Sequence, residues 1–210
     1  MSRDDEKRAA AEEAARLLAD GMTVGLGTGT TVAFLISALA GRDLRCIATS
    51  ARTEDAARAA GLRLEPFEKL DRLDFAIDGA DQVDPAGWLV KGGGAAHTRE
   101  KIAAAAADRF VVIVSSDKLV ETIAPPIPVE ILPFGVKATL RTLGHAQLRD
   151  VPPSPDGGLI ADYLGPVDDP ADLAERLAST PGIVEHGLFA PELVSEIIVG
   201  RAGGVERRMV

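Results

Sequence analysis

The residues best suited to chemistry lie in one connection, residues 77–101, which contains aspartates, a lysine, three consecutive glycines and a glutamate. Asp78 and Asp81 follow an apolar run that ends abruptly, and Lys91 ends a second apolar segment. Glu100 falls near the start of an alanine-rich segment that is typical of a helix. Carboxylates, an ammonium group and accessible backbone together suit proton transfer to and from a small molecule.

Each of these signals also has a purely structural explanation. Asp-Gly is an ordinary turn dipeptide, a glutamate in the first turn of a helix suits the helix dipole, and Gly92–Gly94 are typical of a mobile loop. Their density within one connection favours a site, because groups just beyond the carboxyl ends of strands line the crevice in which α/β proteins bind ligands. His97 has no second His or Cys nearby, so we assign it no metal.

A second signal is the glycine-rich turn in residues 24–31, between an apolar strand end and an apolar helix. Glycines expose backbone N–H groups at a helix N-terminus, which favours phosphate, and Thr28, Thr30 and Thr31 add hydroxyl donors. The dinucleotide fingerprint requires a third glycine where Thr30 stands, and the ATP-type loop requires Gly-Lys-Ser/Thr. A phosphorylated small molecule therefore suits the turn better than a nucleotide, and the alternative is a tight turn without a ligand.

Composition excludes several classes of function. With 46% hydrophobic but only 4% aromatic residues, the core must consist mainly of Ala, Val, Leu and Ile. A formal charge of −9 argues against nucleic acid or an anionic membrane as partner, because both require basic patches. The first residues lack an apolar signal core and no run long enough for a membrane span occurs, so we expect a cytoplasmic protein. Cys46, the one cysteine, is expected to be a small buried residue of a strand.

Strand-like and helix-like segments alternate along the first half of the chain, after an amphipathic helix expected at Glu6–Asp20. Such alternation predicts an α/β fold with a Rossmann-like, mostly parallel sheet and helices on both faces. The expected strands are Thr23–Leu26, Arg45–Ala48, Leu73–Ile77 and Phe110–Ser115, and the expected helices are Thr31–Ala40, Thr53–Ala60 and Thr98–Asp108.

A proline cluster at Ala124–Pro128 indicates a boundary, beyond which the order β-α-β-β-α-β predicts a smaller α+β domain of the ferredoxin-like kind. The predicted domains are residues 1–126 with 195–210, and residues 127–194. The expected strands of the smaller domain are Val129–Leu132, Ala146–Arg149, Leu159–Tyr163 and Gly182–Leu188, its helices are Val136–Leu143 and Pro170–Ser179, and Glu196–Val199 is expected to return to the first sheet.

Five blocks of residues stand out along the chain: GLGTGTT at residues 25–31, DGAD at 78–81, KGGGAAHTREK at 91–101, SSDKLV at 115–120 and GLFA at 187–190. In these blocks, in their order and over nearly its whole length, the chain resembles the metal-independent ribose-5-phosphate isomerase A family. This resemblance implies interconversion of D-ribose 5-phosphate and D-ribulose 5-phosphate in the pentose phosphate pathway, without a cofactor, in a homodimer or homotetramer.

The resemblance also implies roles for individual residues. Glu100 corresponds to the general base that moves a proton between C1 and C2. Asp78 and Asp81 match carboxylates that handle hydroxyl protons and ring opening, and Lys91 matches a lysine of the sugar pocket. The remaining residues that match substrate-binding positions are Lys7, Thr28, Gly29, Thr30, Thr31, Gly79, Ala80, Gly92, Gly93, Gly94 and Lys118, among which Lys7, Lys118 and the threonines resemble phosphate ligands.

One residue departs from the family, which usually has a glutamate where this chain has Gln82, and we assign Gln82 no role.

Three other functions are considered as alternatives. An isomerase or deaminase of aminosugar phosphates would release ammonia from glucosamine 6-phosphate. A sugar-phosphate-sensing domain of a transcription regulator needs a basic recognition helix, which this acidic chain lacks. A coenzyme A transferase is disfavoured by the short chain and the paired aspartates.

Overall fold

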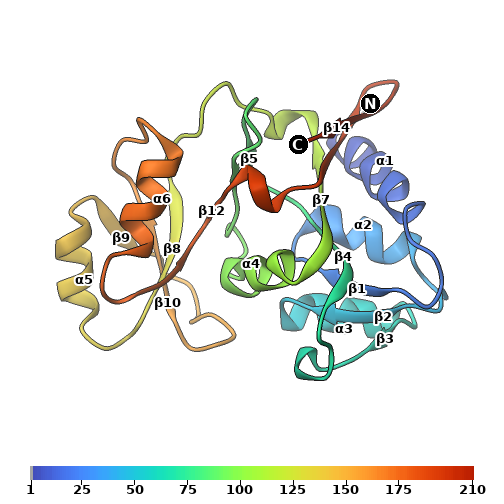
Figure 1. Cartoon of the computed structure of the whole chain (residues 1–210), viewed down its shortest axis with the longest axis horizontal. Helices are drawn as coiled ribbons and strands as arrows, with labels where there is room; N and C mark the ends of the chain where they lie inside the picture. The colour runs from blue at the N-terminus through green and yellow to red at the C-terminus, as the bar shows by residue number, and fades with distance from the viewer. Residues whose placement is uncertain (1) are drawn as a thin grey trace. The chain divides into compact units, whose positions relative to one another are not determined.

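A computed structural model describes residues 2–210 (Figure 1). The chain forms two compact units, each of which is described by itself below. The first unit consists of the residues up to Ala80, Arg99–Leu119 and Pro191–Val210, and the second consists of Asp81–Thr98 and Val120–Ala190. The predicted domain bounds at residues 126 and 195 stay a prediction, because compactness alone does not delimit a domain that folds by itself.

The first unit is built on one seven-stranded sheet, in the order β14-β13-β7-β4-β1-β2-β3. All neighbours pair in parallel except β14, which is antiparallel to β13. The chain runs outward from β1 through β2 to β3 and then returns to the other side of β1, which is the strand order of Rossmann-like sheets. The strands are β1 Thr23–Leu26, β2 Arg45–Ala48, β3 Arg63–Leu64, β4 Leu73–Asp78, β7 Ala107–Ser115, β13 Glu196–Arg201 and β14 Gly204–Met209.

Helices cover both faces of this sheet, as predicted. Helices α1, α2 and α3 share a core with one face, and α1 packs directly against α2, whereas Ala103 of α4 packs with Ile47 and Leu73 on the other face. Small residues allow this close packing, since Ala10, Ala11 and Ala14 are fully buried. The helices are α1 Arg3–Ala15, α2 Thr30–Ala38, α3 Ala51–Ala59 and α4 His97–Ala105, with short 3-10 turns η1 Phe67–Lys69, η2 Ser116–Lys118 and η3 Pro191–Leu193.

Two helix predictions are wrong at their ends. Helix α1 begins at Arg3 because Ser2 and Asp5 form a capping box, in which each side chain accepts the other's backbone N–H at 3.2 and 2.8 Å. The helix stops at Ala15, well before the predicted end at Asp20. Helix α4 stops at Ala105 because Ala107 already pairs with Leu73 as the first residue of β7.

The second unit contains a four-stranded antiparallel sheet in the order β11-β8-β10-β9. When the strands of this sheet are numbered in chain order, the order is 4-1-3-2, and together with two helices it confirms the predicted ferredoxin-like arrangement. A smaller sheet, β12-β6-β5, completes the unit. The elements are β5 Gln82–Val83, β6 Leu89–Val90, β8 Ile127–Ile131, α5 Val136–Leu143, β9 Ala146–Leu148, β10 Leu159–Tyr163, α6 Pro170–Ala178, β11 Ile183–His186 and β12 Leu188–Phe189.

The predicted strand Gly182–Leu188 is divided at Gly187. The Gly187 N–H donates to the Pro128 carbonyl at 2.7 Å, while its own carbonyl accepts the Lys91 N–H at 2.8 Å. The strand thus changes from the larger to the smaller sheet at this residue. Only glycine is accommodated there, because a Cβ at Gly187 would overlap the carbonyl oxygen of Lys91.

Two further sequence expectations concern membranes and cysteine. Among residues 2–210, no helix has the length and apolarity needed to cross a bilayer. Cys46 lies fully buried in β2, as predicted, and burial raises the pKa of its thiol to about 12. A thiol in this environment stays protonated and is unsuited to nucleophilic chemistry.

Candidate active site

The predicted phosphate turn and Asp78 meet where the strand order of the first unit reverses. Strands β1 and β4 are neighbours there, and their connections run to opposite sides of the sheet. The Thr28 N–H donates to Oδ1 of Asp78 at 3.0 Å, and the Gly27 N–H donates to the Ile77 carbonyl at 3.0 Å. The carboxyl edge at such a reversal is the usual ligand site of open α/β sheets.

Gly27 is required for this arrangement. A Cβ at Gly27 would overlap the carboxyl group of Asp78, which is itself buried at 3% exposure. The Gly79 N–H also donates to Oδ1 of Asp78 at 2.7 Å. Two backbone donors therefore hold this carboxyl group at the strand ends.

The glycine-rich turn continues directly into α2. Its N-cap residue is Gly29, with φ of 131°, a conformation that favours glycine, and Gly29 and Thr30 are exposed. The first N–H groups of α2 have no partner within the helix, as at any helix start, and the helix dipole favours an anion there. The exposed turn thus presents backbone donors to solvent, and its role as a phosphate site stays a prediction.

The side chain of Thr28 is engaged with neighbouring hydroxyl groups. Its Oγ1 lies 3.0 Å from Thr49 Oγ1, 2.9 Å from Ser50 Oγ and 3.3 Å from Thr53 Oγ1. Thr53 in turn donates to the Gly27 carbonyl at 2.8 Å. This hydroxyl cluster fixes the turn against the β2–α3 connection. Sequence analysis missed it, although Ser50 preceding a helix is a recognisable N-cap signal.

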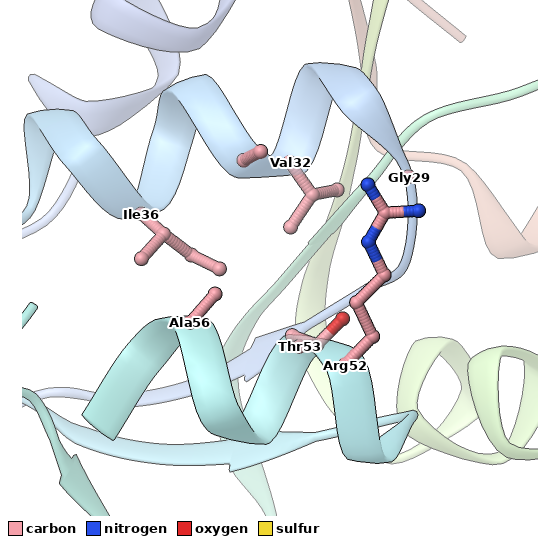
Figure 2. A pocket seen from close by; sticks show the side chains of 7 residues that line it. Gly29, Val32, Ile36, Arg52, Thr53 and Ala56 are labelled. Carbon is pink, nitrogen blue, oxygen red and sulfur yellow. The ribbon is translucent and has the colours of Figure 1, made fainter. Parts of the chain in front are cut away.

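A small cavity lies between α2 and α3 beside the turn (Figure 2). Val32 and Ile36 line it from α2, Ala56 lines it from α3, and the side chain of Arg52 extends toward Gly29. Its volume of about 20 Å³ is enough for about one water molecule, so it is no sugar site. The exposed Arg52 nevertheless brings a guanidinium group to the turn, a feature that sequence analysis did not identify.

Glu100 lies in the first turn of α4 and is buried, with 5% exposure. Three residues further along the same helix face, Ala103 packs 3.5 Å from the position of a Cβ at Gly25. Gly25 pairs with Ala76, and residues two further along each strand, Gly27 and Asp78, share that face of the sheet.

The direction of α4 follows from the topology. Along the sequence, α4 comes after β4 and directly before β7, and these two strands are parallel. The N-terminus of α4 therefore lies toward the carboxyl ends of both strands. Glu100 is one turn closer to that end than Ala103. This register directs Glu100 toward the strand ends that carry Gly27 and Asp78.

The two predicted phosphate lysines lie on segments that are tied together. Lys7 is in α1 and Lys118 is in η2. Glu6 accepts hydrogen bonds from the Ser116 N–H at 2.9 Å and from Ser116 Oγ at 2.8 Å, which joins α1 to η2. The ammonium nitrogen of the half-buried Lys7 lies 3.3 Å from Oδ1 of the exposed Asp4.

The neighbouring Asp117 is held by Ser115. The Ser115 hydroxyl donates to Oδ1 of Asp117 at 2.5 Å, and this bond lowers the pKa of the carboxyl group, with a smaller contribution from Arg3. Asp117 is thus a paired anion beside Lys118.

The remaining predicted residues lie in the second unit. Lys91 is buried at 3% exposure, and its ammonium nitrogen lies 5.5 Å from the centroid of the Phe189 ring, a cation–π distance. Oδ2 of the exposed Asp81 accepts the Gly93 N–H at 2.8 Å. The structure thus brings Asp81 and the glycine loop together within this unit, as it brings Asp78 and the phosphate turn together in the first.

Gln82 has a structural role that its sequence position did not reveal. Its side-chain amide donates to the Ala124 carbonyl at 2.7 Å and accepts the Ala124 N–H at 2.9 Å. A glutamate is unable to form both bonds when ionised, because a carboxylate has no donor.

His97 is fully buried in the second unit, and its Nε2 lies 3.4 Å from the Glu185 carbonyl. Across residues 2–210, no group of three or more His, Cys, Asp or Glu side chains is arranged to hold a metal ion.

Comparison with known sequences identifies one family. The family model for ribose 5-phosphate isomerase A (phosphoriboisomerase A) matches residues 45–204. Ribose-5-phosphate isomerase A of Natronomonas pharaonis is 46% identical and that of Rhodopseudomonas palustris is 40% identical, with 97% of this chain and at least 96% of each relative covered.

Solved structures agree in fold. Ribose 5-phosphate isomerase A of Methanocaldococcus jannaschii matches with a TM-score of 0.93 at 33% identity, and both chains are covered fully. A D-ribose-5-phosphate isomerase in complex with phospho-erythronic acid matches with a TM-score of 0.94 at 34% identity, again over both whole chains. This chain belongs to the ribose 5-phosphate isomerase A family.

Proposed function

We propose that this protein interconverts D-ribose 5-phosphate and D-ribulose 5-phosphate through an enediolate, as a step of the pentose phosphate pathway. The observation that carries the proposal is the meeting of the phosphate turn with Asp78 at the strand-order reversal, in a chain that belongs to this family. The complex of a similar isomerase with phospho-erythronic acid supports a phosphorylated sugar as the ligand.

The phosphate end of the substrate is assigned to the turn at residues 28–31. Backbone N–H groups at the start of α2 and the hydroxyls of Thr30 and Thr31 are the donors, and the exposed Gly29 permits close approach. Lys7 and Lys118 supply positive charge, and Arg52 adds a further cation. Because the chain is acidic overall, local cations of this kind are needed to attract an anion. Binding this remote end holds C1 and C2 of the sugar in place for reaction.

Glu100 is assigned as the base. It removes the proton from C2 of the open-chain aldose, and a proton is then delivered to C1, so one carboxylate serves both carbons. Its burial and the register of α4 support this role, since a base must lie near the strand edge where the sugar is held. A positioned base contributes ~10² to 10⁴ in rate.

The hydroxyl protons need separate groups. During the reaction the oxygen on C1 gains a proton and the oxygen on C2 loses one. Lys91 is assigned to stabilise the developing enediolate oxygen, and Asp78 and Asp81 are assigned to move hydroxyl protons and to open the sugar ring. Gly79, Ala80 and Gly92–Gly94 are assigned as backbone neighbours of the sugar. No cofactor is assigned to any step.

The first test is a turnover assay with ribose 5-phosphate in the presence of a chelator, in which ribulose 5-phosphate is detected directly. We expect turnover that the chelator does not reduce. An inactive, folded wild-type protein would refute the proposed reaction, and activity lost on chelation but restored by added metal would refute metal independence.

The second test uses deuterated water and the Glu100→Gln variant. Wild-type protein is expected to exchange substrate hydrogen with solvent, and the variant is expected to lose turnover by about three orders of magnitude or more. Glu54→Gln is the matched control, because Glu54 also lies in the first turn of a nine-residue helix, α3. Turnover of Glu100→Gln near that of the control would exclude Glu100 as the base.

We also propose that the protein acts in the cytoplasm as a homodimer or homotetramer. Sedimentation or light scattering of the purified protein tests the assembly, and a monomer at working concentration would refute it.

A further inference from the structure

The loop that follows Lys91 has a specific backbone conformation. Gly92 has φ of 105°, a value that favours glycine, and a Cβ there would lie 2.7 Å from Nδ1 of His97 and 2.8 Å from Cβ of Pro128. The Gly92 carbonyl accepts the Ala95 N–H at 3.1 Å, which closes a tight turn over Gly93 and Gly94. The two exposed glycines at its tip have no side chains to hold them, and their position depends on the Gly93 N–H bond to Asp81 and on what anchors Gly92.

Arg149 supplies such an anchor. Its Nη1 donates to the Gly92 carbonyl oxygen at 2.8 Å, across 57 residues of sequence. The same guanidinium group is gripped by Asp162, with Nε to Oδ2 at 2.8 Å and Nη2 to Oδ1 at 2.5 Å. Both side chains are largely buried, with 17% and 21% exposure. Two parallel bonds to a carboxylate fix the plane of the guanidinium, and this plane directs its third donor at the loop.

Arg149 and Asp162 are both held by regular strands of the four-stranded sheet. Asp162 lies in β10, and Arg149 directly follows β9, where its N–H donates to the Ile160 carbonyl at 2.8 Å. The Arg149–Asp162 pair thus joins neighbouring strands of the larger sheet and extends from them to a loop. A pair that served only to join two strands would need no bond to Gly92.

We propose that Arg149 is a positioning residue of the isomerase, which holds the Lys91–Gly94 loop in the conformation that the sugar requires. This inference rests on the proposed function, because that function assigns the loop to the substrate. Arg149 acts through the Gly92 carbonyl and needs no contact with the sugar. Its effect is preorganisation: without the bond, the glycine loop samples other conformations and must be ordered at each binding event.

The test compares Arg149→Ala and Asp162→Asn with the wild type in steady-state kinetics. We expect kcat/KM for ribose 5-phosphate to fall ~10- to 100-fold in Arg149→Ala and by less in Asp162→Asn, where the guanidinium remains but is less firmly oriented. Added guanidinium ion is expected to restore part of the activity of Arg149→Ala. The matched control is Arg45→Ala in the first unit, which breaks a similar two-bond pair with Glu65, at 2.9 and 2.8 Å, and is expected to leave kcat/KM unchanged.

A second measurement separates this inference from the proposed function. Amide hydrogen exchange at residues 92–96 of the free protein is expected to be faster in Arg149→Ala than in the wild type, and unchanged in Arg45→Ala. Unchanged exchange in Arg149→Ala would overturn the inference even if the isomerase activity were confirmed. Activity that falls only in proportion to the unfolded fraction, without rescue by guanidinium, would also overturn it. An inactive wild type with faster exchange in the variant would refute the proposed function while confirming the anchor.

Discussion

The backbone N–H of Thr28 donates a 3.0 Å hydrogen bond to the carboxylate of Asp78, residues that are 50 positions apart in the sequence. This bond joins the end of β1 to the end of β4 at the one place in the sheet where the strand order reverses. Thr28, at the start of the proposed phosphate turn, is therefore held by Asp78, which is a proposed acid/base group. Changes that disturb this bond are expected to affect both substrate binding and proton transfer.

Gly27→Ala tests how closely the turn must approach Asp78. The added methyl group would overlap the Asp78 carboxyl group, so the turn or the carboxyl group must move. We expect a loss of about 1 to 3 kcal/mol in the free energy of unfolding, measured by urea denaturation, and a clear loss of turnover. Gly79→Ala is the control for stability, because the nearest atom to a Cβ there is 3.7 Å away. Equal stability of the two variants would contradict the crowding argument.

Glu6→Ala tests the connection between the helix that carries Lys7 and the turn that carries Lys118. The variant loses both hydrogen bonds to Ser116, so the lysines are less firmly placed. Steady-state kinetics are expected to show KM for ribose 5-phosphate raised ~3- to 10-fold, a cost of about 1 kcal/mol, with a smaller change in kcat. Glu12→Ala, at an exposed position of the same helix, is expected to leave KM unchanged. An unchanged KM in Glu6→Ala would remove this connection from the phosphate site.

Asp74 is expected to give the first unit an acid-sensitive contribution to stability. Hydrogen bonds from the Thr23 N–H at 2.7 Å and then from its hydroxyl at 2.8 Å lower the pKa of this carboxyl group. A lowered pKa favours the folded state above the ordinary Asp value of about 3.9. The contribution is therefore complete at neutral pH and is lost as the pH falls below about 4 toward the lowered folded value.

Asp74→Asn checks this pH dependence. We expect the variant to be less stable than the wild type by about 1 kcal/mol at pH 7, and the difference in the free energy of unfolding to shrink as the pH falls below about 4. Asp71→Asn, at an exposed position nearby, serves as the control. A stability difference for Asp74→Asn that did not vary between pH 7 and pH 3 would contradict the argument.

Gln82→Glu restores the residue type usual in the family and is expected to be mildly destabilising in this chain. At neutral pH the carboxylate keeps the bond from the Ala124 N–H but loses the donor to the Ala124 carbonyl. We expect a loss of about 1 kcal/mol by denaturation, with kcat unchanged because Gln82 has no assigned part in the reaction. A large change in kcat would instead reveal a catalytic role at this position.

The sequence predicted the larger elements well because each is long enough to show its own pattern. Strands β1 and β2, helix α5 and strand β10 have the predicted bounds. The two-residue strands β3 and β5 were missed, since alternation is not visible over two residues. Strand β6 corresponds to the apolar segment that ends at Lys91, and the predicted strand Gly182–Leu188 already included the first residue of β12. Strand β14 was also missed, because its mostly polar sequence forms a strand by pairing with the edge of β13. Partners, and not local preference, define such strands.

The residue types of the candidate site could be predicted from the sequence, but the hydrogen bonds that hold these residues in place could not. The motif around Asp78 and the glycine turn both follow strands, so their placement at one sheet edge could be inferred. The pairing of β1 with β4 depends on the order of all the strands in the sheet, and the sequence does not reveal that order. Bonds such as that from Arg149 to Gly92 join segments without any local signal, and so only the folded chain reveals them.

The division of the chain has a consequence for how this protein can be dissected or recombined. The polypeptide passes between its two units four times, after Ala80, Thr98, Leu119 and Ala190. A fragment cut at the last two of these points would lack β5 and β6, and would leave β12 without its pairing partner. Neither unit can therefore be excised as one continuous gene segment, and the two are expected to be inherited together rather than exchanged as interchangeable modules.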